Sequence, residues 1–355
     1  MNSLIKKIIK IFLIGLVSIL YLFSIYLLFS SITDYKPQKI ENIELKGNIV
    51  NYQVDYDELN LLSWNIGYAG LSKEMDFFYD GGSKVKPNFE IYQKALNGIL
   101  NTLVKNSYVD FILLQEVDVF SNRSYYCNQK AFISEFLPDF AYAFAVNYDV
   151  KYVLLPLYAP MGRVKAGLQT LAKYKPIEIK RHAFAANFDW PKKLLMLDRC
   201  FLVTNYLLNN GKQLIVVNTH NSTYDGGLLS KREMDELKLF VTTEYNKGNY
   251  VIVGGDWNNN PPGFKKVQSF KNNKIFHLDN EVSNNFMPQN WQWIFDAEIP
   301  TNRNVNESYN AKSTGTTVID YYLVSPNIEA LSIRNLDLDF EFSDHNPVLI
   351  NVKLK

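Results

Sequence analysis

The sequence contains few cysteines: Cys127 and Cys200 are the only two among its 355 residues. Neither stands beside a histidine or in a closely spaced pair, so the sequence offers no pattern for a thiol nucleophile or a cysteine-ligated metal. In a domain of this size, a disulfide between the two cysteines and a pair of buried free thiols are both compatible with the sequence.

The sequence also lacks a surplus of basic residues. It has 37 Lys and Arg against 36 Asp and Glu, a formal net charge of +1. Lys6, Lys7 and Lys10 lie before an apolar N-terminal run, so the rest of the chain holds 34 basic and 36 acidic residues, a net charge of −2. Proteins that bind nucleic acid generally carry a basic surplus. Nucleic acid is therefore a less favoured partner, although a local basic patch is compatible with this balance.

No Pro/Gly/Ser-rich tract, block of like charge or internal repeat divides the chain after Leu59. The composition, 47% hydrophobic and 21% charged, is typical of a globular protein with an extensive core. We therefore expect one domain of roughly 300 residues, over residues 58–355.

The N-terminus carries a long apolar run. Ile11 to Ser31 is 21 residues without a charge, about 32 Å long as a helix and enough to cross a bilayer. The three lysines before it predict a cytoplasmic N-terminus. We expect a cytoplasmic stub over 1–10, a transmembrane signal anchor over 11–32 and a tether over 33–57, with the domain outside the cytoplasm. A cleaved signal peptide is the alternative, but its apolar core is usually shorter and Phe29-Ser30-Ser31 is a poor cleavage site.

Strand-like runs outnumber helical ones along the rest of the chain. Glu58 to Asn65, Val109 to Gln115 and Tyr250 to Val253 read as buried strands, whereas Asn88 can cap a helix and Leu228 to Glu244 forms another. This alternation predicts a sheet-on-sheet core with outer helices. Tyr148 to Lys165 is interpreted as an ordered loop that packs its own apolar residues, or alternatively as an apolar lip that touches lipid.

Four short segments place polar side chains at or just after strand-like runs. They are Leu62-Ser-Trp-Asn65, Leu113-Leu-Gln-Glu116, Gly254-Gly-Asp-Trp-Asn258 and Ser343-Asp-His-Asn-Pro347. Val217-Asn-Thr-His220 and Ile319-Asp-Tyr321 add to the set. A hard divalent cation takes oxygen ligands, and hydrolysis of a phosphate ester needs a positioned water and a proton donor. Together the segments hold the parts of a metal-dependent phosphoesterase.

The set resembles the endonuclease/exonuclease/phosphatase superfamily, which includes deoxyribonuclease-like and neutral-sphingomyelinase-like enzymes. The resemblance runs from about Leu59 to Val352. It implies an α/β fold of two packed β-sheets flanked by helices, a four-layered α/β sandwich, with a magnesium site at one end of the sheets. Here the fold would follow an N-terminal transmembrane helix.

The resemblance implies a metal site for Mg²⁺, with Mn²⁺ as an alternative, held by Glu116, Asn65 and Asp344. Glu116 also fits on physical grounds, because a carboxylate at the end of a buried strand is costly to keep charged without a cation or hydrogen bonds.

By the same resemblance, Asp256 orients or deprotonates the attacking water and Asn258 binds a phosphate oxygen. His220 binds phosphate or donates a proton, and Asp320 pairs with His345 to orient the imidazole and raise its basicity. Asp256 and Asn258 are two residues apart, which in an extended backbone directs both side chains to one side. We interpret the other histidines, His182 and His277, as structural.

Two positions depart from the family pattern. Nuclease members often carry a phenylalanine between the aspartate and asparagine that match Asp256 and Asn258, where this chain has Trp257. Many members carry an arginine two residues before the aspartate that matches Asp320, where this chain has Val318. Four arginines are candidates to replace that cation: Arg123, Arg163, Arg199 and Arg303.

These features predict a membrane-anchored, magnesium-dependent phosphodiesterase or phosphatase acting on a lipid headgroup or small phosphoester. An extracytoplasmic nuclease is the first alternative, and a non-catalytic anchored binding module is the second. The sequence indicates no protein partner.

Overall fold

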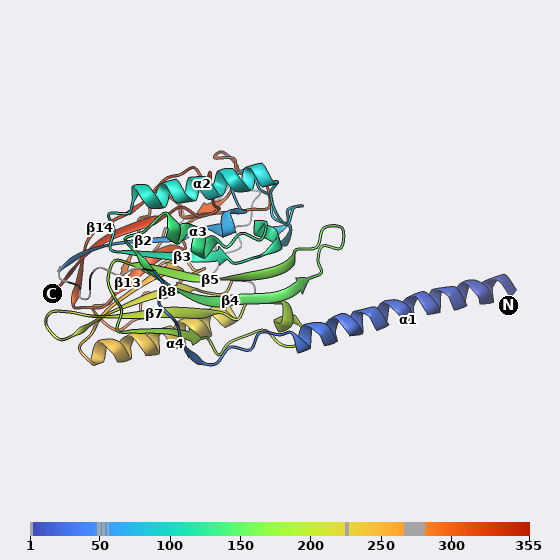
Figure 1. Ribbon diagram of the computed structural model, residues 1–355, viewed down its shortest axis with the longest axis horizontal. Coiled ribbons are helices and arrows are strands. Elements are labelled where there is room, and N and C mark those ends of the chain that lie inside the picture. The colour runs from blue at the N-terminus through green and yellow to red at the C-terminus, as the bar shows by residue number, and fades with distance from the viewer. Residues whose placement is uncertain (1–2, 48–50, 52–53, 55–56, 224–226, 266–280) are drawn as a thin grey trace.

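Two β-sheets pack face to face in the computed structural model, which describes residues 3–47, 51, 54, 57–223, 227–265 and 281–355. Helices cover the outer faces of both sheets, and one long helix projects from the end of the sandwich (Figure 1). The prediction of an α/β fold with two sheets flanked by helices is confirmed.

The first sheet has six strands in the order β14-β15-β2-β3-β5-β4. Only β2 and β3 are parallel, and the other neighbours are antiparallel. Its strands are β2 (Glu58–Asn65), β3 (Phe111–Asp118), β4 (Ala141–Val153), β5 (Gly162–Ala172), β14 (Ile328–Asn335) and β15 (Val348–Leu354).

The second sheet has seven strands in the order β1-β6-β7-β8-β9-β13-β10, and only β8 and β9 are parallel. Its strands are β1 (Ile40–Asn42), β6 (Glu178–Ala183), β7 (Cys200–Leu207), β8 (Gln213–His220), β9 (Tyr250–Asp256), β10 (Gln292–Ile294) and β13 (Asp320–Val324). A short ribbon of β11 (Asn302–Arg303) and β12 (Thr316–Thr317) lies apart from both sheets.

Three helices cover the sandwich. Helices α2 (Phe89–Lys105) and α3 (Gln129–Glu135) lie on the six-stranded sheet, and α4 (Leu228–Asn246) lies on the other (Figure 1). The predicted cap of α2 is present, since Asn88 Oδ1 accepts a hydrogen bond from the Ile91 N–H at 2.8 Å. One apolar cluster packs beneath α2 and α3, a second packs beneath α4, and a third fills the space between the two sheets. Cys127 and Cys200 are free thiols.

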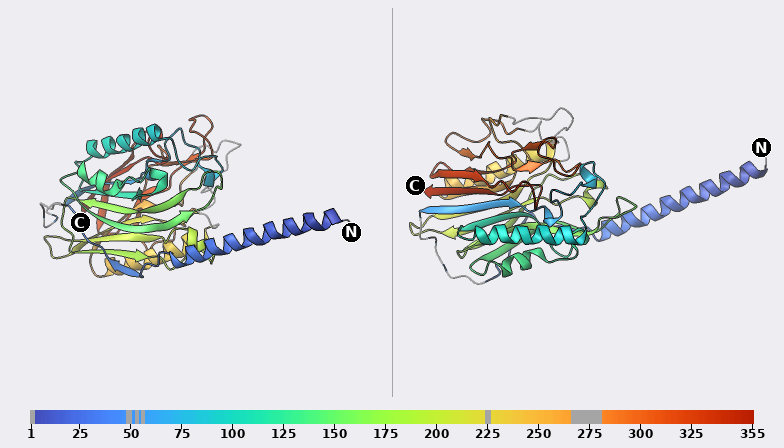
Figure 2. Two further views of the ribbon diagram at one scale, coloured as in Figure 1. Left: turned by 45° about the vertical axis from the view of Figure 1, so that its right-hand side comes forward. Right: turned by 90° about the horizontal axis from the view of Figure 1, so that it is seen from above.

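Helix α1 (Ser3–Ile32) is 30 residues long, or about 45 Å, and leaves the domain at one end (Figure 2). By length and composition it can cross a membrane, and its most apolar stretch is not buried against the domain. Part of the segment after it, which we expected to be a tether, is docked on the domain. Ile40–Asn42 forms β1 at the open edge of β6, where its backbone groups find hydrogen-bond partners.

The expectation of a loop over Tyr148 to Lys165 is wrong at both ends. Strand β4 continues to Val153 and β5 begins at Gly162, which leaves a hairpin tip over 154–161. Pro156 and Pro160 interrupt the backbone pairing only within this tip. Backbone pairing between β4 and β5 gives strand structure to residues whose local sequence does not indicate it. Strand β14 was likewise not predicted.

A buried polar bridge joins the two sheets. Gln115 on β3 donates from Nε2 to Asn218 Oδ1 on β8 at 2.8 Å. Asn218 Nδ2 donates in turn to the backbone carbonyl oxygens of Leu114 and Gln169. Both amide side chains are fully buried, so their hydrogen bonds constrain how the sheets align.

The pairing of β8 with β9 requires a glycine at position 255. Gly255 has φ +151°, and a Cβ atom there would lie 2.0 Å from the carbonyl oxygen of Thr219 on β8. Gly211 also has a positive φ, +78°, but a Cβ there would meet open space.

We predict that Gly255→Ala lowers the free energy of unfolding by about 2–4 kcal/mol, because it adds a backbone clash to the φ strain. Gly211→Ala is the matched control and should cost only about 1–2 kcal/mol of φ strain. Denaturant unfolding of the detergent-solubilised proteins measures both. Equal losses in the two variants would show that the close approach to Thr219 is unimportant.

Candidate active site

Eight polar residues predicted from the sequence motifs lie together at one end of the sandwich. Six of them line a cavity of about 550 Å³: Glu116, His220, Asp256, Asn258, Asp344 and His345. Asn65 and Asp320 contact members of this group from behind. They come from both sheets, at the ends of β2, β3, β8 and β9, at the start of β13, and in the loop before β15.

Asn65 joins acidic residues of the two sheets. Its Nδ2 donates to Glu116 Oε1 at 3.2 Å and to Asp256 Oδ2 at 2.9 Å. Its Oδ1 accepts from the Gly67 N–H at 3.0 Å, which holds the amide in this orientation. The side chain therefore sets the spacing between the carboxylates of β3 and β9.

Glu116 lies at an irregularity in β3. Its φ is +54°, in the left-handed region, and the register with β5 shifts between Leu114 and Val117. A bulge of this kind redirects one side chain of a strand, and a left-handed backbone in a residue other than glycine is strained. The surrounding sheet holds Glu116 in this conformation, with its carboxylate toward the cavity.

Asp256 and Asn258 both reach the cavity, but a turn places them there rather than the extended backbone that we predicted. Strand β9 ends at Asp256, and Asn258 has φ +51°. Asp256 Oδ1 accepts from the Asn258 N–H at 3.0 Å, and Asn258 Nδ2 donates to the Asn221 carbonyl at 2.7 Å. Burial raises the pKa of Asp256.

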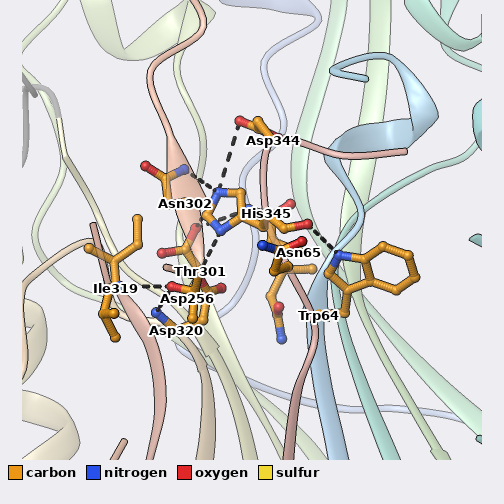
Figure 3. Close-up of polar contacts among 12 residues, drawn as sticks. Trp64, Asn65, Asp256, Thr301, Asn302, Ile319, Asp320, Asp344 and His345 are labelled. Carbon is orange, nitrogen blue, oxygen red and sulfur yellow. Dashed lines mark hydrogen bonds and ion pairs between the residues drawn. The ribbon is translucent and has the colours of Figure 1, made fainter. Parts of the chain in front are cut away.

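His345 is held by a carboxylate. Its Nδ1 lies 2.7 Å from Asp320 Oδ2, and its Nε2 faces Asn302 Nδ2 at 2.9 Å and Asp256 Oδ2 at 3.7 Å (Figure 3). The Trp64 indole N–H donates to the His345 carbonyl at 2.8 Å. Burial alone lowers the pKa of His345, but the negative charges of Asp320, Asp256 and Asp344 outweigh it and raise the pKa to about 10.

His220 has a different electrostatic environment. Its Nε2 lies 3.4 Å from Asp256 Oδ2 and 3.9 Å from Glu116 Oε1. Burial, together with the positive charges of Arg199 and His345, holds the pKa of His220 well below its usual value. The two histidines of the cavity thus differ: His345 favours the charged form and His220 the neutral form.

Asp344 lies opposite His345 on the cavity wall. Its Oδ2 is 4.0 Å from His345 Nε2, and its Oδ1 accepts from Ser343 Oγ at 3.3 Å. Burial raises the pKa of Asp344 to about 7, and the charge of Glu116 adds to the shift.

The oxygen-rich residues fit a hard divalent cation. Glu116, Asp256 and Asp344 line one cavity, and burial or mutual repulsion disfavours the charged forms of Asp256 and Asp344. A cation would relieve that cost, and carboxylate and amide oxygens are its preferred ligands. Asp256, Asp320 and His345 form a second close group, with one ligand atom of each within 4.8 Å of the others. Because His345 already pairs with Asp320, the carboxylates on the Glu116 side of the cavity fit a cation better.

The four candidate arginines differ in their partners. Arg123 makes a double hydrogen bond to Asp118, and Arg303 Nη1 and Nη2 donate to backbone carbonyls, including those of Leu71 and Ser72. Arg199 lines the cavity and donates to the His220 carbonyl at 3.2 Å, with no carboxylate within ion-pair distance among the described residues. Arg163 is not among the residues that line the cavity. Arg199 is therefore the arginine best placed for an anionic substrate.

The structure adds one contact to the site that the sequence did not indicate. Asn302, on β11, lies against His345 Nε2. It occurs in a stretch of irregular sequence without strand-like or motif-like pattern, so no local signal marks it. His182 stacks on Phe201, away from the cavity, and burial lowers the pKa of His182 to about 4, as suits a structural residue. His277 lies outside the described residues.

Comparisons with known proteins agree with this arrangement. A profile of the endonuclease/exonuclease/phosphatase family matches residues 62–345. A search of curated protein sequences finds no match.

Several solved structures share the fold. An endonuclease/exonuclease/phosphatase from Beutenbergia cavernae has 15% identity and a TM-score of 0.53, over 84% of this chain and 72% of its own. ANGEL2, a 2′,3′-cyclic phosphatase, has 16% identity and a TM-score of 0.53, over 90% and 99%. D. rerio TDP2, complexed with a single-strand DNA product, has 13% identity and a TM-score of 0.50, over 83% and 99%.

At these identities the solved structures show a shared fold alone, whereas the profile match spans most of the sequence and includes all eight polar residues of the site. This chain belongs to the endonuclease/exonuclease/phosphatase family, which comprises phosphoester hydrolases and nucleases.

Proposed function

We propose that this protein is a membrane-anchored, divalent-metal-dependent phosphoester hydrolase that acts on a lipid headgroup or a small phosphoester. The observation that carries the proposal is the meeting of three carboxylates and two histidines of opposite charge preference in one cavity of a family member. Glu116 and Asp344 would hold Mg²⁺ or Mn²⁺, which supplies neutralisation of phosphate charge when bound. Asn65, expected from the resemblance to be a third ligand, has its Oδ1 on the Gly67 N–H, so it would support the metal by orienting Glu116 through Nδ2.

The protein's own groups divide the remaining work. Asp256, held by Asn65 and the Asn258 N–H, is placed to orient a water molecule and accept its proton. His345 is oriented by the contact of its Nδ1 with Asp320 and would contact the phosphate from the cavity wall. Burial lowers the pKa of His220, which favours a role as a hydrogen-bond donor to a phosphate oxygen. Asn258 and Arg199 border the same cavity as further phosphate contacts.

A nuclease remains the alternative, since the same groups serve a nucleic-acid phosphodiester. The near-neutral charge and the apolar lining beyond the polar groups favour a smaller or lipid substrate. Hydrolysis by the purified protein of DNA, sphingomyelin, phosphoinositides and bis-p-nitrophenyl phosphate, each with Mg²⁺, separates these functions. No turnover of any of them would leave the non-catalytic binding module.

Glu116→Gln tests the metal assignment. It removes one carboxylate charge and keeps the side-chain shape, so metal-dependent turnover should fall by about 10²–10³-fold. Initial rates with bis-p-nitrophenyl phosphate against Mg²⁺ and Mn²⁺ concentration measure the loss, and thermal unfolding checks the fold. Glu135→Gln, exposed on α3, is the control. Full activity of Glu116→Gln, or of the parent protein in excess chelator, would contradict the assignment.

Asp320→Asn tests the role of the pair with His345. The amide cannot stabilise the charged imidazole, so kcat should fall by about 10²–10⁴-fold with a smaller change in KM. Steady-state kinetics over pH 5–9 measure it, with Asp139→Asn, exposed after α3, as the control. An unchanged kcat would remove Asp320 and His345 from the proposed mechanism.

The anchor's orientation is a separate proposal. Lys6, Lys7 and Lys10 before the apolar helix favour residues 1–10 in the cytoplasm, the span over 11–32, and residues 58–355 outside. Protease added to spheroplasts should then digest the domain, and mass spectrometry of mature protein should find residues 1–31 retained. A protected domain would reverse the orientation, and a mature chain beginning near Ile32 would identify a cleaved signal peptide.

A further inference from the structure

The cavity that holds the polar groups has a second, apolar part. Apolar side chains of β4, of the hairpin tip and of neighbouring loops line it together with the polar groups, and most of them pack in one apolar cluster. They include Phe77, Val153, Leu154, Met161, Leu195 and Leu197. At about 550 Å³, the cavity falls within the roughly 300–1,000 Å³ range of small-ligand sites. It therefore offers a phosphate-binding end and a hydrocarbon-like end in one space.

The anchor helix forms part of the apolar wall. Phe23 and Tyr26 of α1 line the same cavity as the polar groups. The Tyr26 hydroxyl donates to the Tyr152 carbonyl on β4 at 3.0 Å, so the last turns of α1 are held against the domain. The Tyr79 hydroxyl donates to the Leu155 carbonyl at 2.7 Å and holds the hairpin tip in turn. The hairpin and α1 lie at the same end of the sandwich (Figures 1 and 2).

The position of these residues along α1 sets their depth in a bilayer. Counted from Ile11, where the uncharged run begins, Phe23 lies about 18 Å and Tyr26 about 22 Å along the helix. In a hydrocarbon core about 30 Å thick, both belong to the half that faces the domain. The nearby hairpin tip exposes Leu157 and Tyr158, each 72% accessible. Exposed apolar and aromatic side chains beside a membrane helix suit the boundary between headgroups and hydrocarbon.

Resting on the proposed function, we propose that the last turns of α1 and the β4–β5 hairpin form a subsite for the hydrocarbon chain of a phosphate-bearing membrane lipid. The lipid enters sideways from the leaflet next to the domain. Its phosphate lies at the Glu116, Asp256 and His345 end, and the first part of its chain lies along Phe23, Val153 and Leu154. The anchor is then a part of the substrate site as well as a membrane attachment.

The occupant follows from the continuity of the two linings. A nucleic-acid strand presents charged and polar groups on both sides of each phosphate, and an apolar wall formed by a membrane helix would desolvate them without partners. A hydrocarbon chain loses nothing by leaving the bilayer for an apolar wall, since both environments are equally apolar. The phosphate-binding end of the cavity would accept either substrate, so by itself it does not distinguish a nucleic acid from a lipid.

The test combines lipid photolabelling with a matched pair of leucine variants. Full-length Glu116→Gln protein is placed in phosphatidylcholine nanodiscs with Mg²⁺ and phosphatidic acid that carries a diazirine in one acyl chain. Labelled peptides are mapped by mass spectrometry. We expect labels at 153–155, Met161 and Phe23, and competition by unlabelled phosphatidic acid but not by glycerol phosphate.

Leu154→Trp is then added to fill the apolar part of the cavity, with Leu157→Trp at the exposed tip as its control. Labelling at Val153 and Met161 should fall about fivefold or more in Leu154→Trp, because the added volume takes the space of the chain. It should stay within about twofold in the control. Labels confined to the outward side chains of α1, such as Leu22, or equal labelling in both variants, would overturn the subsite.

Hydrolysis of a phosphoester that has no hydrocarbon chain separates this proposal from the proposed function on which it rests. In a background with Glu116 intact, the control Leu157→Trp, which lies outside the cavity lining, should hydrolyse bis-p-nitrophenyl phosphate at about the parent rate. Turnover of this chain-free ester without specific lipid labelling would refute the lipid subsite and leave the hydrolase standing. Specific labelling by a parent protein that hydrolyses no phosphoester would refute the hydrolase and support the subsite.

Discussion

The amide of Asn65 is the contact on which the site depends, because it connects a carboxylate of each sheet. It donates to Glu116 on the six-stranded sheet and to Asp256 on the seven-stranded one. Gln115, the residue directly before Glu116 on β3, donates a hydrogen bond to Asn218 of β8 and keeps the two sheets in a single alignment. A slip of either sheet would break these buried hydrogen bonds and separate the carboxylates, so the core and the site share one constraint.

The fold holds this site in an unfavourable state. Burial and mutual repulsion raise the pKa values of Asp256 and Asp344, whereas the negative charges around His345 raise the pKa of its imidazole. Glu116 and Asn258 add strained backbone at the same place. Strained backbone persists only where the surrounding structure enforces it. A bound cation would reduce the electrostatic cost of keeping the buried carboxylates charged. The strained backbone and the buried carboxylates thus occur at the same end of the sandwich, where the proposed cation would lie.

The same end of the sandwich faces the anchor. The chain that leaves α1 docks as β1 on the edge of β6, and Tyr26 is bonded to β4. Backbone pairing and the Tyr26 hydrogen bond therefore hold the domain against the end of α1, in addition to the covalent link. Phe23 and Tyr26 of α1 thus form part of the cavity wall.

Local patterns in the sequence determined those structural features that depend on residues close together along the chain. The bounds of β2, the Asn88 cap, the apolar helix and the polar residues at strand ends are all of this kind, since each follows from alternation, capping or composition. The two-sheet architecture followed from the family resemblance together with the run of strands. The tertiary structure alone decided the docking of β1, the length of the β4–β5 hairpin, the turn that aims Asn258, the approach of Asn302 to His345, and the partners of the arginines. These features depend on contacts between residues far apart in sequence, and no local periodicity encodes which distant backbone or side chain will complete them.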